Sequence, residues 1–236
     1  MKRTLIAGFF FLGCLFSLKG MADQSKQHSP KEALQVFNEL IGTWKGTAQP
    51  AGSFEEQRNN FWIEKIDWQW QFKGNDAWLV MDFKKSKNFL SGELRFLPDK
   101  DLFQLTMKTV DKKSQTFTGK LVKRVLTLDR EEAGEGQRLV ITMLHAKRYL
   151  YRYDVRPKNK TLFSMRYKVG ATREGVPFVE GTGQPECIVS GGFGTIPVTF
   201  NGQKYFVCCS GCRDEFNANP AKYVREYEAK KGKKDK

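Results

Sequence analysis

Apolar and polar residues alternate with a period of two over most of this chain, from Gly42 to about Val169. A β-strand turns successive side chains to opposite faces, so such a pattern predicts strands with one buried face. The clearest example is the segment 66–73. Its odd positions are Asp, Gln, Gln and Lys, and its even positions are the apolar residues Ile66, Trp68, Trp70 and Phe72.

Turn residues separate these segments, as at 74–76 and 98–101, and divide the region into about eight to ten short antiparallel strands. Successive hairpins with one solvated face indicate an up-and-down sheet, and closure into a barrel removes the unpaired edges. A short helix is expected first, because Ser29, Pro30 and Glu32 form a helix-start signal. We therefore predict a mainly β protein with a barrel domain at residues 29–169, followed by a small α+β cysteine-rich module.

The segment Gly42-Thr43-Trp44-Lys45-Gly46, placed after a short helix, resembles the entry to lipocalin-like barrels, including the nitrobindin-type proteins. That resemblance implies a barrel that carries an apolar small molecule or haem. His145 is the only histidine of the barrel region, and it shares strand parity with Ile141 and Met143. It is therefore the candidate haem ligand, and the alternative is a hydrogen-bonded structural histidine.

The N-terminus has the pattern of a secretory signal. A basic pair precedes the apolar run Leu5–Leu18, and small residues lead to Ala22. The run is shorter than the ~20 residues that a membrane-spanning helix needs. We expect cleavage near Ala22, a periplasmic or secreted location, and no transmembrane segment in the mature chain. Acylation of Cys14, which would make a lipoprotein, is the alternative, but the apolar run continues past that residue.

The formal net charge is +14. For an exported chain this charge favours anionic lipid, cell-wall polymers or solubility, so we expect no nucleic-acid partner. The lysine-rich end, 229–236, is expected to be a basic disordered tail. The sequence contains no nucleophile-elbow, zinc-protease or phosphate-loop motif in a suitable context, and we recognise no catalytic residues and no enzyme.

Four cysteines lie near the C-terminus, at Cys187, Cys208, Cys209 and Cys212. They follow a Gly-rich linker, 170–183, and belong to a predicted module at residues 184–228. The module contains a strand, an Asn-Gly turn, a second strand and a helix that starts at Ser210. This order places Cys208 at a strand end and Cys212 in the first turn of a helix, where a thiolate is stabilised.

Soft thiolates without a nearby histidine favour Zn²⁺ or Cu⁺ as the bound ion. Cys187, Cys208 and Cys212 are the candidate ligands. The fourth position is left to Cys209, to water or Asp214, or to no group in three-coordinate Cu⁺. Two alternatives stay open: disulfides, since exported thiols meet an oxidising compartment, and a thiol-redox protein that uses Cys209 and Cys212 as a Cys-x-x-Cys pair.

The segment 184–225 resembles the YHS and TRASH metal-binding families. The matching residues are Cys187-Ile188-Val189-Ser190-Gly191, the Asn201-Gly202 turn, Cys208-Cys209-Ser210-Gly211-Cys212, Phe216 and Asn219-Pro220-Ala221-Lys222-Tyr223. The Tyr-His-Ser triplet that names the YHS family is absent. The resemblance implies binding of a transition or heavy metal, often within trafficking or resistance systems.

These observations together predict an exported, bacterial-type metal-binding protein that sequesters, delivers or senses a thiophilic transition metal. Its expected partners are the ion and another metal-handling protein. The alternative functions are a barrel-type carrier of an apolar molecule or haem, with a structural metal site, and the thiol-redox protein.

Overall fold

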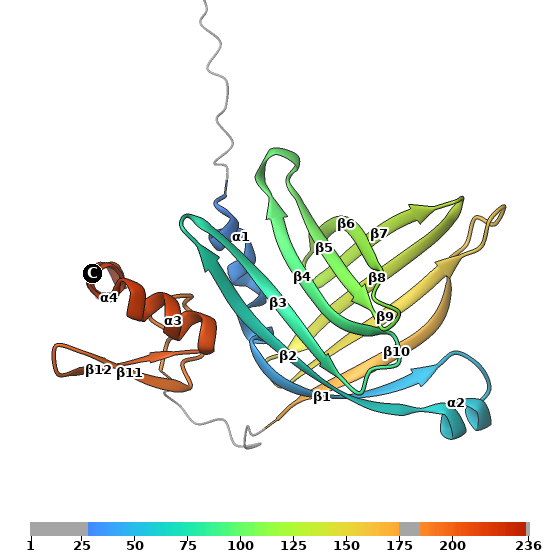
Figure 1. Cartoon of the computed structure of the whole chain (residues 1–236), viewed down its shortest axis with the longest axis horizontal. Helices are drawn as coiled ribbons and strands as arrows, with labels where there is room; N and C mark the ends of the chain where they lie inside the picture. The colour runs from blue at the N-terminus through green and yellow to red at the C-terminus, as the bar shows by residue number, and fades with distance from the viewer. Residues whose placement is uncertain (1–27, 175–184, 235–236) are drawn as a thin grey trace, which may run out of the picture.

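The computed structural model describes residues 28–174 and 185–234. The predicted signal peptide with Cys14, and most of the predicted linker, lie outside these ranges. The described residues form a closed antiparallel barrel and a smaller C-terminal region of two strands and two helices (Figure 1). The predicted fold class is therefore confirmed.

Ten barrel strands are present in the described part of the chain: β1 (Gly42–Pro50), β2 (Trp62–Lys73), β3 (Asp76–Lys84), β4 (Phe89–Leu97), β5 (Leu102–Thr109), β6 (Ser114–Val122), β7 (Val125–Glu132), β8 (Glu135–His145), β9 (Arg148–Arg156) and β10 (Ser164–Arg173). Each strand pairs with its neighbours in the sequence, and β1 closes the barrel by pairing with β10. A short helix, α2 (Phe54–Asn60), and a 3₁₀ turn, η2 (Pro98–Lys100), join two of the pairs. Residues 170–173, which were expected to open the linker, instead belong to β10.

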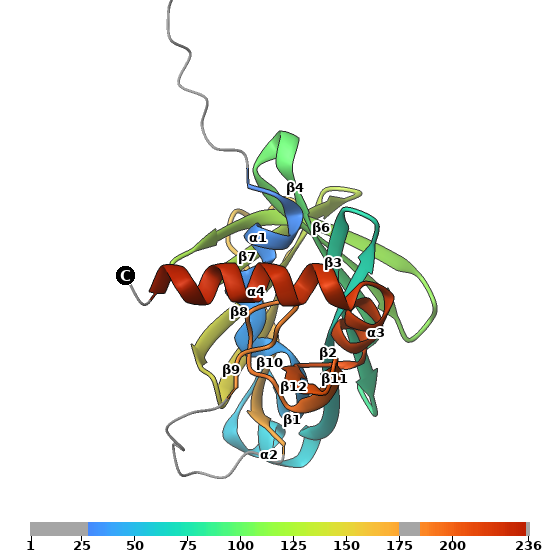
Figure 2. The same ribbon diagram turned by 90° about the vertical axis from the view of Figure 1, so that its left-hand side faces the viewer.

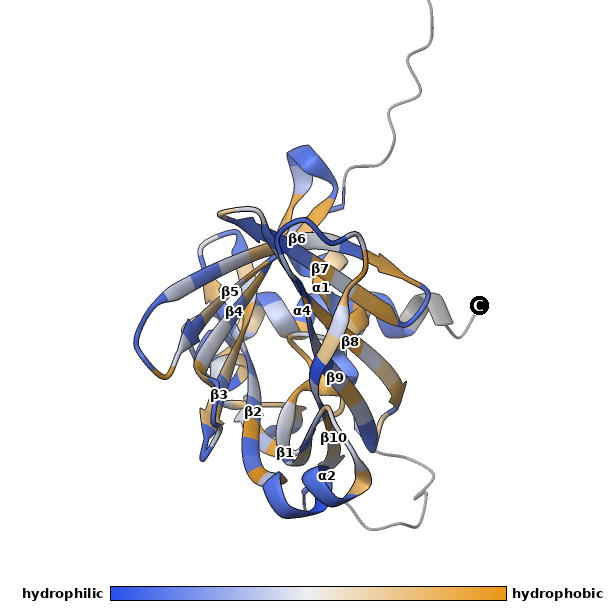
Figure 3. Cartoon of the chain, turned by 90° about the vertical axis from the view of Figure 1, so that its right-hand side faces the viewer, coloured by the Kyte–Doolittle hydropathy of each residue, from blue (hydrophilic) through white to orange (hydrophobic). Residues whose placement is uncertain are grey.

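The alternation along the strands matches the sequence pattern, and Figure 3 shows hydrophobic and hydrophilic residues following one another along them. Ile66, Trp68 and Trp70 of β2 are fully buried in the core, and Phe72 packs against it. The interior is filled by such side chains. The apolar void beside Trp68 and Tyr149 measures about 20 Å³, which is room for roughly one water molecule.

The predicted first helix begins where expected and then changes form. Ser29 and Glu32 make the reciprocal hydrogen bonds of a capping box at the start of α1 (Pro30–Leu34). The chain then tightens into the 3₁₀ helix η1 (Gln35–Leu40) before Gly42. Leu34 and Phe37 are fully buried in the barrel core, so this segment is tied to the barrel.

The C-terminal region consists of a tight loop after Pro185, the hairpin β11 (Ile196–Phe200) and β12 (Gln203–Val207), and the helices α3 (Ser210–Ala218) and α4 (Pro220–Lys234). It lies beside the barrel on the side where β2 and α1 are found, and α4 crosses in front of α1 in Figure 2, with Nζ of Lys31 5.1 Å from the centre of the Tyr223 ring (Figures 1 and 2). The helix α4 reaches Lys234, so the expected tail at 229–236 is helical over most of its length. None of the helices in the described ranges is long and apolar enough to cross a membrane.

Candidate metal centre

The first thiol, Cys187, is presented by a short closed loop. The Cys187 N–H donates to the carbonyl of Gly192 at 2.6 Å, and the Gly191 N–H donates to the carbonyl of Cys187 at 2.8 Å. Gly191 has a φ of +78°, which L-residues with side chains rarely adopt. The loop is held to the hairpin by the Ile188 N–H, which donates to the carbonyl of Phe206 at 2.9 Å.

The other two candidate ligands flank the start of α3. Cys208 directly follows β12, and Cys212 lies in the first turn of the helix, as the sequence predicts. The Sγ atoms of Cys187, Cys208 and Cys212 lie within 4.8 Å of one another, and those of Cys208 and Cys212 are 3.5 Å apart. Sulfur ligands about 2.3 Å from a shared zinc ion stand roughly 4 Å apart, so this spacing fits a metal site.

Cys209 and Asp214, the two candidates for the fourth position, differ from these three. Cys209 is the N-cap residue of α3, and its Sγ is 3.9 Å from that of Cys208, but it does not belong to the group that meets around one point. Asp214 is exposed and forms an ion pair with Arg213, so it is not a ligand in this arrangement.

Hydrogen bonds distribute the protons of the thiols unevenly. Hydrogen bonds from Cys208 and Cys212 lower the pKa of Cys187, and those from the same two residues lower the pKa of Cys209. Cys208 donates to Cys187 and Cys209, which raises its pKa, whereas burial raises the pKa of Cys212. The cluster therefore combines two thiols of lowered pKa with two of raised pKa.

Ser190 contacts two of the ligands and also ties them to the barrel. Its N–H donates to Sγ of Cys187 at 3.5 Å, and its Oγ lies 3.3 Å from Sγ of Cys208. Its carbonyl accepts hydrogen bonds from the side-chain amides of Gln35 at 3.1 Å and Asn38 at 2.9 Å, both in η1. Such outer contacts orient the ligands of a metal site.

Two cations from the barrel lie near the thiols. Burial lowers the pKa of Lys31, against the opposing charges of Glu226, Cys212 and Cys187. Burial also lowers the pKa of Arg173, and there Glu39 and Cys208 oppose the shift. A cation near a site of several thiolates offsets the negative charge that remains after a metal ion binds.

Sequence reasoning missed these barrel residues. Lys31, Gln35, Asn38 and Arg173 are far from the cysteines in the chain and belong to no motif, so only the folded arrangement reveals them. Ser190 lies inside the cysteine segment, and its position between Cys187 and Cys208 was the one signal that could have identified it.

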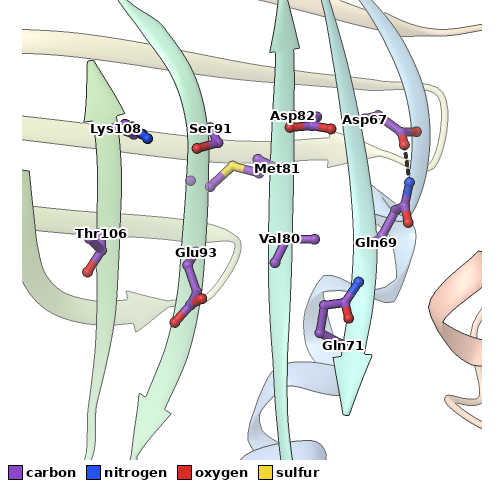
Figure 4. Close-up of a pocket in the computed structure, with 11 residues that line it drawn as sticks. Asp67, Gln69, Gln71, Val80, Met81, Asp82, Ser91, Glu93, Thr106 and Lys108 are labelled. Atoms are coloured by element: carbon purple, nitrogen blue, oxygen red, sulfur yellow. Dashed lines mark hydrogen bonds between the residues drawn. The ribbon is translucent and has the colours of Figure 1, made fainter. Parts of the chain in front are cut away.

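A cleft of about 360 Å³ lies at the edge of the contact between the cysteine cluster and the barrel. Thr43, Asp67 and Arg173 line its barrel side, and Phe193, Cys208 and Cys209 are among the residues on the other side. Asp67 and Gln69 also line a polar hollow on the outer face of β2–β5, where Figure 4 shows them beside Asp82. The cleft therefore connects the thiols with solvent.

His145, the candidate haem ligand, is exposed. A register shift follows Met143 in β8, and His145 lies at the hairpin between β8 and β9. Its Nδ1 accepts a hydrogen bond from the N–H of Lys147 at 3.2 Å. The strand parity that suggested an inward position ends at this shift, so the ring does not point into the barrel.

Neither a protein-family model nor a curated protein matches the sequence. Among solved structures, the chain is similar to an S-type phycobiliprotein lyase from Guillardia theta, with 10% sequence identity and a TM-score of 0.36. The match covers 61% of this chain and 94% of the lyase. The described structure shows a cysteine cluster in residues 184–225. Membership of this segment in the YHS or TRASH families stays a prediction.

Proposed function

We propose that this chain is an exported metal-binding protein that carries one thiophilic ion, Zn²⁺ or Cu⁺, on Cys187, Cys208 and Cys212. The observation that carries the proposal is the convergence of three Sγ atoms within 4.8 Å of one another. They come from three separate elements, a loop, a strand end and a helix start. Three buried thiols that meet at one point are an arrangement that suits a soft metal ion.

The ion is proposed as cargo. Structural zinc sites are closed by four protein ligands, whereas here three thiols converge and the cluster borders a cleft. A site of this kind binds its ion tightly and still allows another thiol ligand to approach. Sequestration and delivery to a second metal-handling protein both use this property.

The alternatives predict other results. In the disulfide hypothesis, Cys208 and Cys212 would oxidise readily, because their Sγ atoms are 3.5 Å apart. In the thiol-redox hypothesis, the reacting pair is Cys209 and Cys212. As a ligand carrier, the barrel would need a cavity of about 300 Å³ or more. The void in its core measures about 20 Å³. In the proposal, the barrel is a scaffold for the cysteine region.

Titration of the reduced protein with Zn²⁺ and with Cu⁺, each against a coloured chelator, tests the proposal. We expect one ion per chain, and a loss of affinity exceeding about 100-fold for Cys187→Ser, Cys208→Ser or Cys212→Ser. Cys209→Ser should change the affinity much less. Failure of the reduced wild-type protein to bind either ion would contradict the proposal, and a dominant effect of Cys209→Ser would favour the redox hypothesis.

Export is tested separately, by mass spectrometry of the mature N-terminus. A chain that begins at Asp23 supports cleavage after Ala22 and release into the periplasm or medium. A chain that begins with a diacylated Cys14 would contradict this and identify a lipoprotein.

A further inference from the structure

The four clustered thiols differ in their access to solvent. Cys187 and Cys212 are 1% and 0% exposed, whereas Cys208 and Cys209 are 8% and 6% exposed. Cys208 and Cys209 line the cleft beside the barrel, and the other two are not among its lining residues. An ion that enters from the cleft therefore meets Cys208 or Cys209 before it reaches the centre of the three-thiol group.

Cys209 lines the cleft beside Cys208 and lies next to the three-thiol group. Its Sγ is 3.9 Å from Sγ of Cys208, which is itself one of the three candidate ligands. Because adjacent residues share a short backbone link, Cys208 and Cys209 cannot both turn fully toward one ion without strain. Cys209 is therefore close to the three converging thiols without being one of them.

The lining of the cleft carries charges of both signs. Asp67 belongs to this lining, and its carboxylate accepts hydrogen bonds from Thr43 and Gln69. Glu174, on the same cleft, forms an ion pair with Lys65 at 2.8 Å. The guanidinium of Arg173 is directed to carbonyl groups, including that of Ile41 at 2.6 Å.

We propose, building on the metal-binding function above, that Cys209 is an exchange thiol that passes the ion between a donor in the cleft and the three-thiol group. In loading, a bond forms between the ion and the Cys209 sulfur while the ion's bond to a donor ligand breaks. Bonds to the three cysteines then replace the bond to Cys209. The oxidation state of the ion does not change, and each thiol that coordinates as a thiolate releases its proton to water.

Transfer kinetics test this role. Cu⁺ or Zn²⁺ is supplied as a complex with a coloured chelator and is later removed by an excess of the same chelator. An exchange thiol lowers the barrier in both directions, so Cys209→Ser should slow loading and removal together by about tenfold, with the dissociation constant changed by less than about threefold. Ile196→Val, which alters the cleft wall without removing a sulfur, is the matched control.

Unchanged rates in Cys209→Ser, with a normal fold by circular dichroism, would overturn the exchange role. Faster removal with weaker binding would also overturn it, because that pattern identifies a fourth ligand. In either case the wild-type protein still binds its ion, so the metal-binding proposal stands. If the wild type binds no ion, the metal-binding proposal itself has failed.

Alkylation gives a readout that does not depend on rates. In the loaded protein, brief treatment with iodoacetamide should modify Cys209 alone, because the other three thiols are occupied by the ion. Peptide mass spectrometry locates the modified residue. Cys209 is 6% exposed, so the metal-free protein is treated in parallel. Modification of Cys209 in the metal-free protein with its protection in the loaded protein would contradict the inference, since the ion itself would then cover Cys209.

Discussion

Ser190 contacts two of the three candidate ligands, Cys187 and Cys208. Its backbone N–H and its hydroxyl face Cys187 and Cys208, and its carbonyl accepts two amide hydrogen bonds from η1. The residue is fully buried. It therefore fixes the positions of two thiols and relates both of them to the barrel.

Replacing this hydroxyl should weaken metal binding without unfolding the chain. Loss of an outer-shell contact typically lowers metal affinity by about 10–100-fold, so Ser190→Ala should fall in that range. Ser210→Ala is the control, because the Ser210 hydroxyl donates to Gln69 of the barrel and not to a thiol. Equal affinities for Ser190→Ala and the wild type would show that the hydroxyl does not support the site.

The proton distribution among the thiols predicts a pH dependence. The pKa values of Cys208 and Cys212 are raised, by hydrogen bonds to neighbouring thiols and by burial respectively, so both thiols hold their protons more strongly than a free cysteine. Coordination as thiolates displaces these protons, so metal binding releases protons and the affinity rises with pH. Calorimetry in buffers of different ionisation enthalpy measures this release. Uptake without proton release would contradict the account.

At the scale of elements, the start of α3 packs directly on the barrel. A Cβ added to Gly211 would lie 1.8 Å from the carbonyl oxygen of Trp70 in β2. Trp70 also donates from Nε1 to Asn38 at 3.0 Å, and Asn38 donates to the carbonyl of Ser190. The contact of Gly211 with Trp70 therefore positions the helix start that carries Cys212. The hydrogen bonds through Asn38 position the loop that carries Cys187.

Gly211→Ala should force α3 away from β2, because the added methyl group has no room. Overpacking of this kind costs about 1–3 kcal/mol of stability, and the displaced Cys212 should lower metal affinity as well. Gly170→Ala is the control, since a Cβ there makes only ordinary contacts, at 3.6 Å from Leu150 and 3.9 Å from Arg148. Thermal denaturation and metal titration of both variants check this. Wild-type behaviour of Gly211→Ala would show that the contact is not tight in solution.

The elements show which features the sequence could reveal. Period-two alternation predicted the strands because one face of each strand is buried. The order of strand, Asn-Gly turn, strand and helix predicted that Cys208 lies at a strand end and Cys212 at a helix start. His145 was misplaced because a register shift after Met143 breaks the alternation. The change to a 3₁₀ helix at Gln35 and the extension of α4 to Lys234 depend on tertiary packing and helix propagation, which local patterns do not report.

At the scale of the whole molecule, a filled barrel supports a small cysteine region. The contacts between them, through η1 and β2, join residues more than 100 positions apart in the chain, such as Asn38 with Ser190 and Gln69 with Ser210. No sequence pattern could show that the barrel supplies the surroundings of the thiols. The barrel itself closes within residues 42–173 and has its own aromatic core.

A chain that ends at Glu174 should therefore fold as a barrel without the cysteine region. Circular dichroism should show β-structure, and heating should give one cooperative transition. The transition should lie a few degrees below that of the full protein, since surfaces on η1 and β2 lose their cover. A shortened chain with no cooperative transition would show that the barrel depends on the cysteine region for folding.

X-ray absorption spectroscopy of the loaded, reduced protein, combined with metal analysis, tests the central claim most directly. The account predicts one ion per chain, with three sulfur neighbours at about 2.3 Å when the ion is zinc. A ligand shell without sulfur, or a reduced protein that retains no ion, would contradict the claim that Cys187, Cys208 and Cys212 form a metal centre.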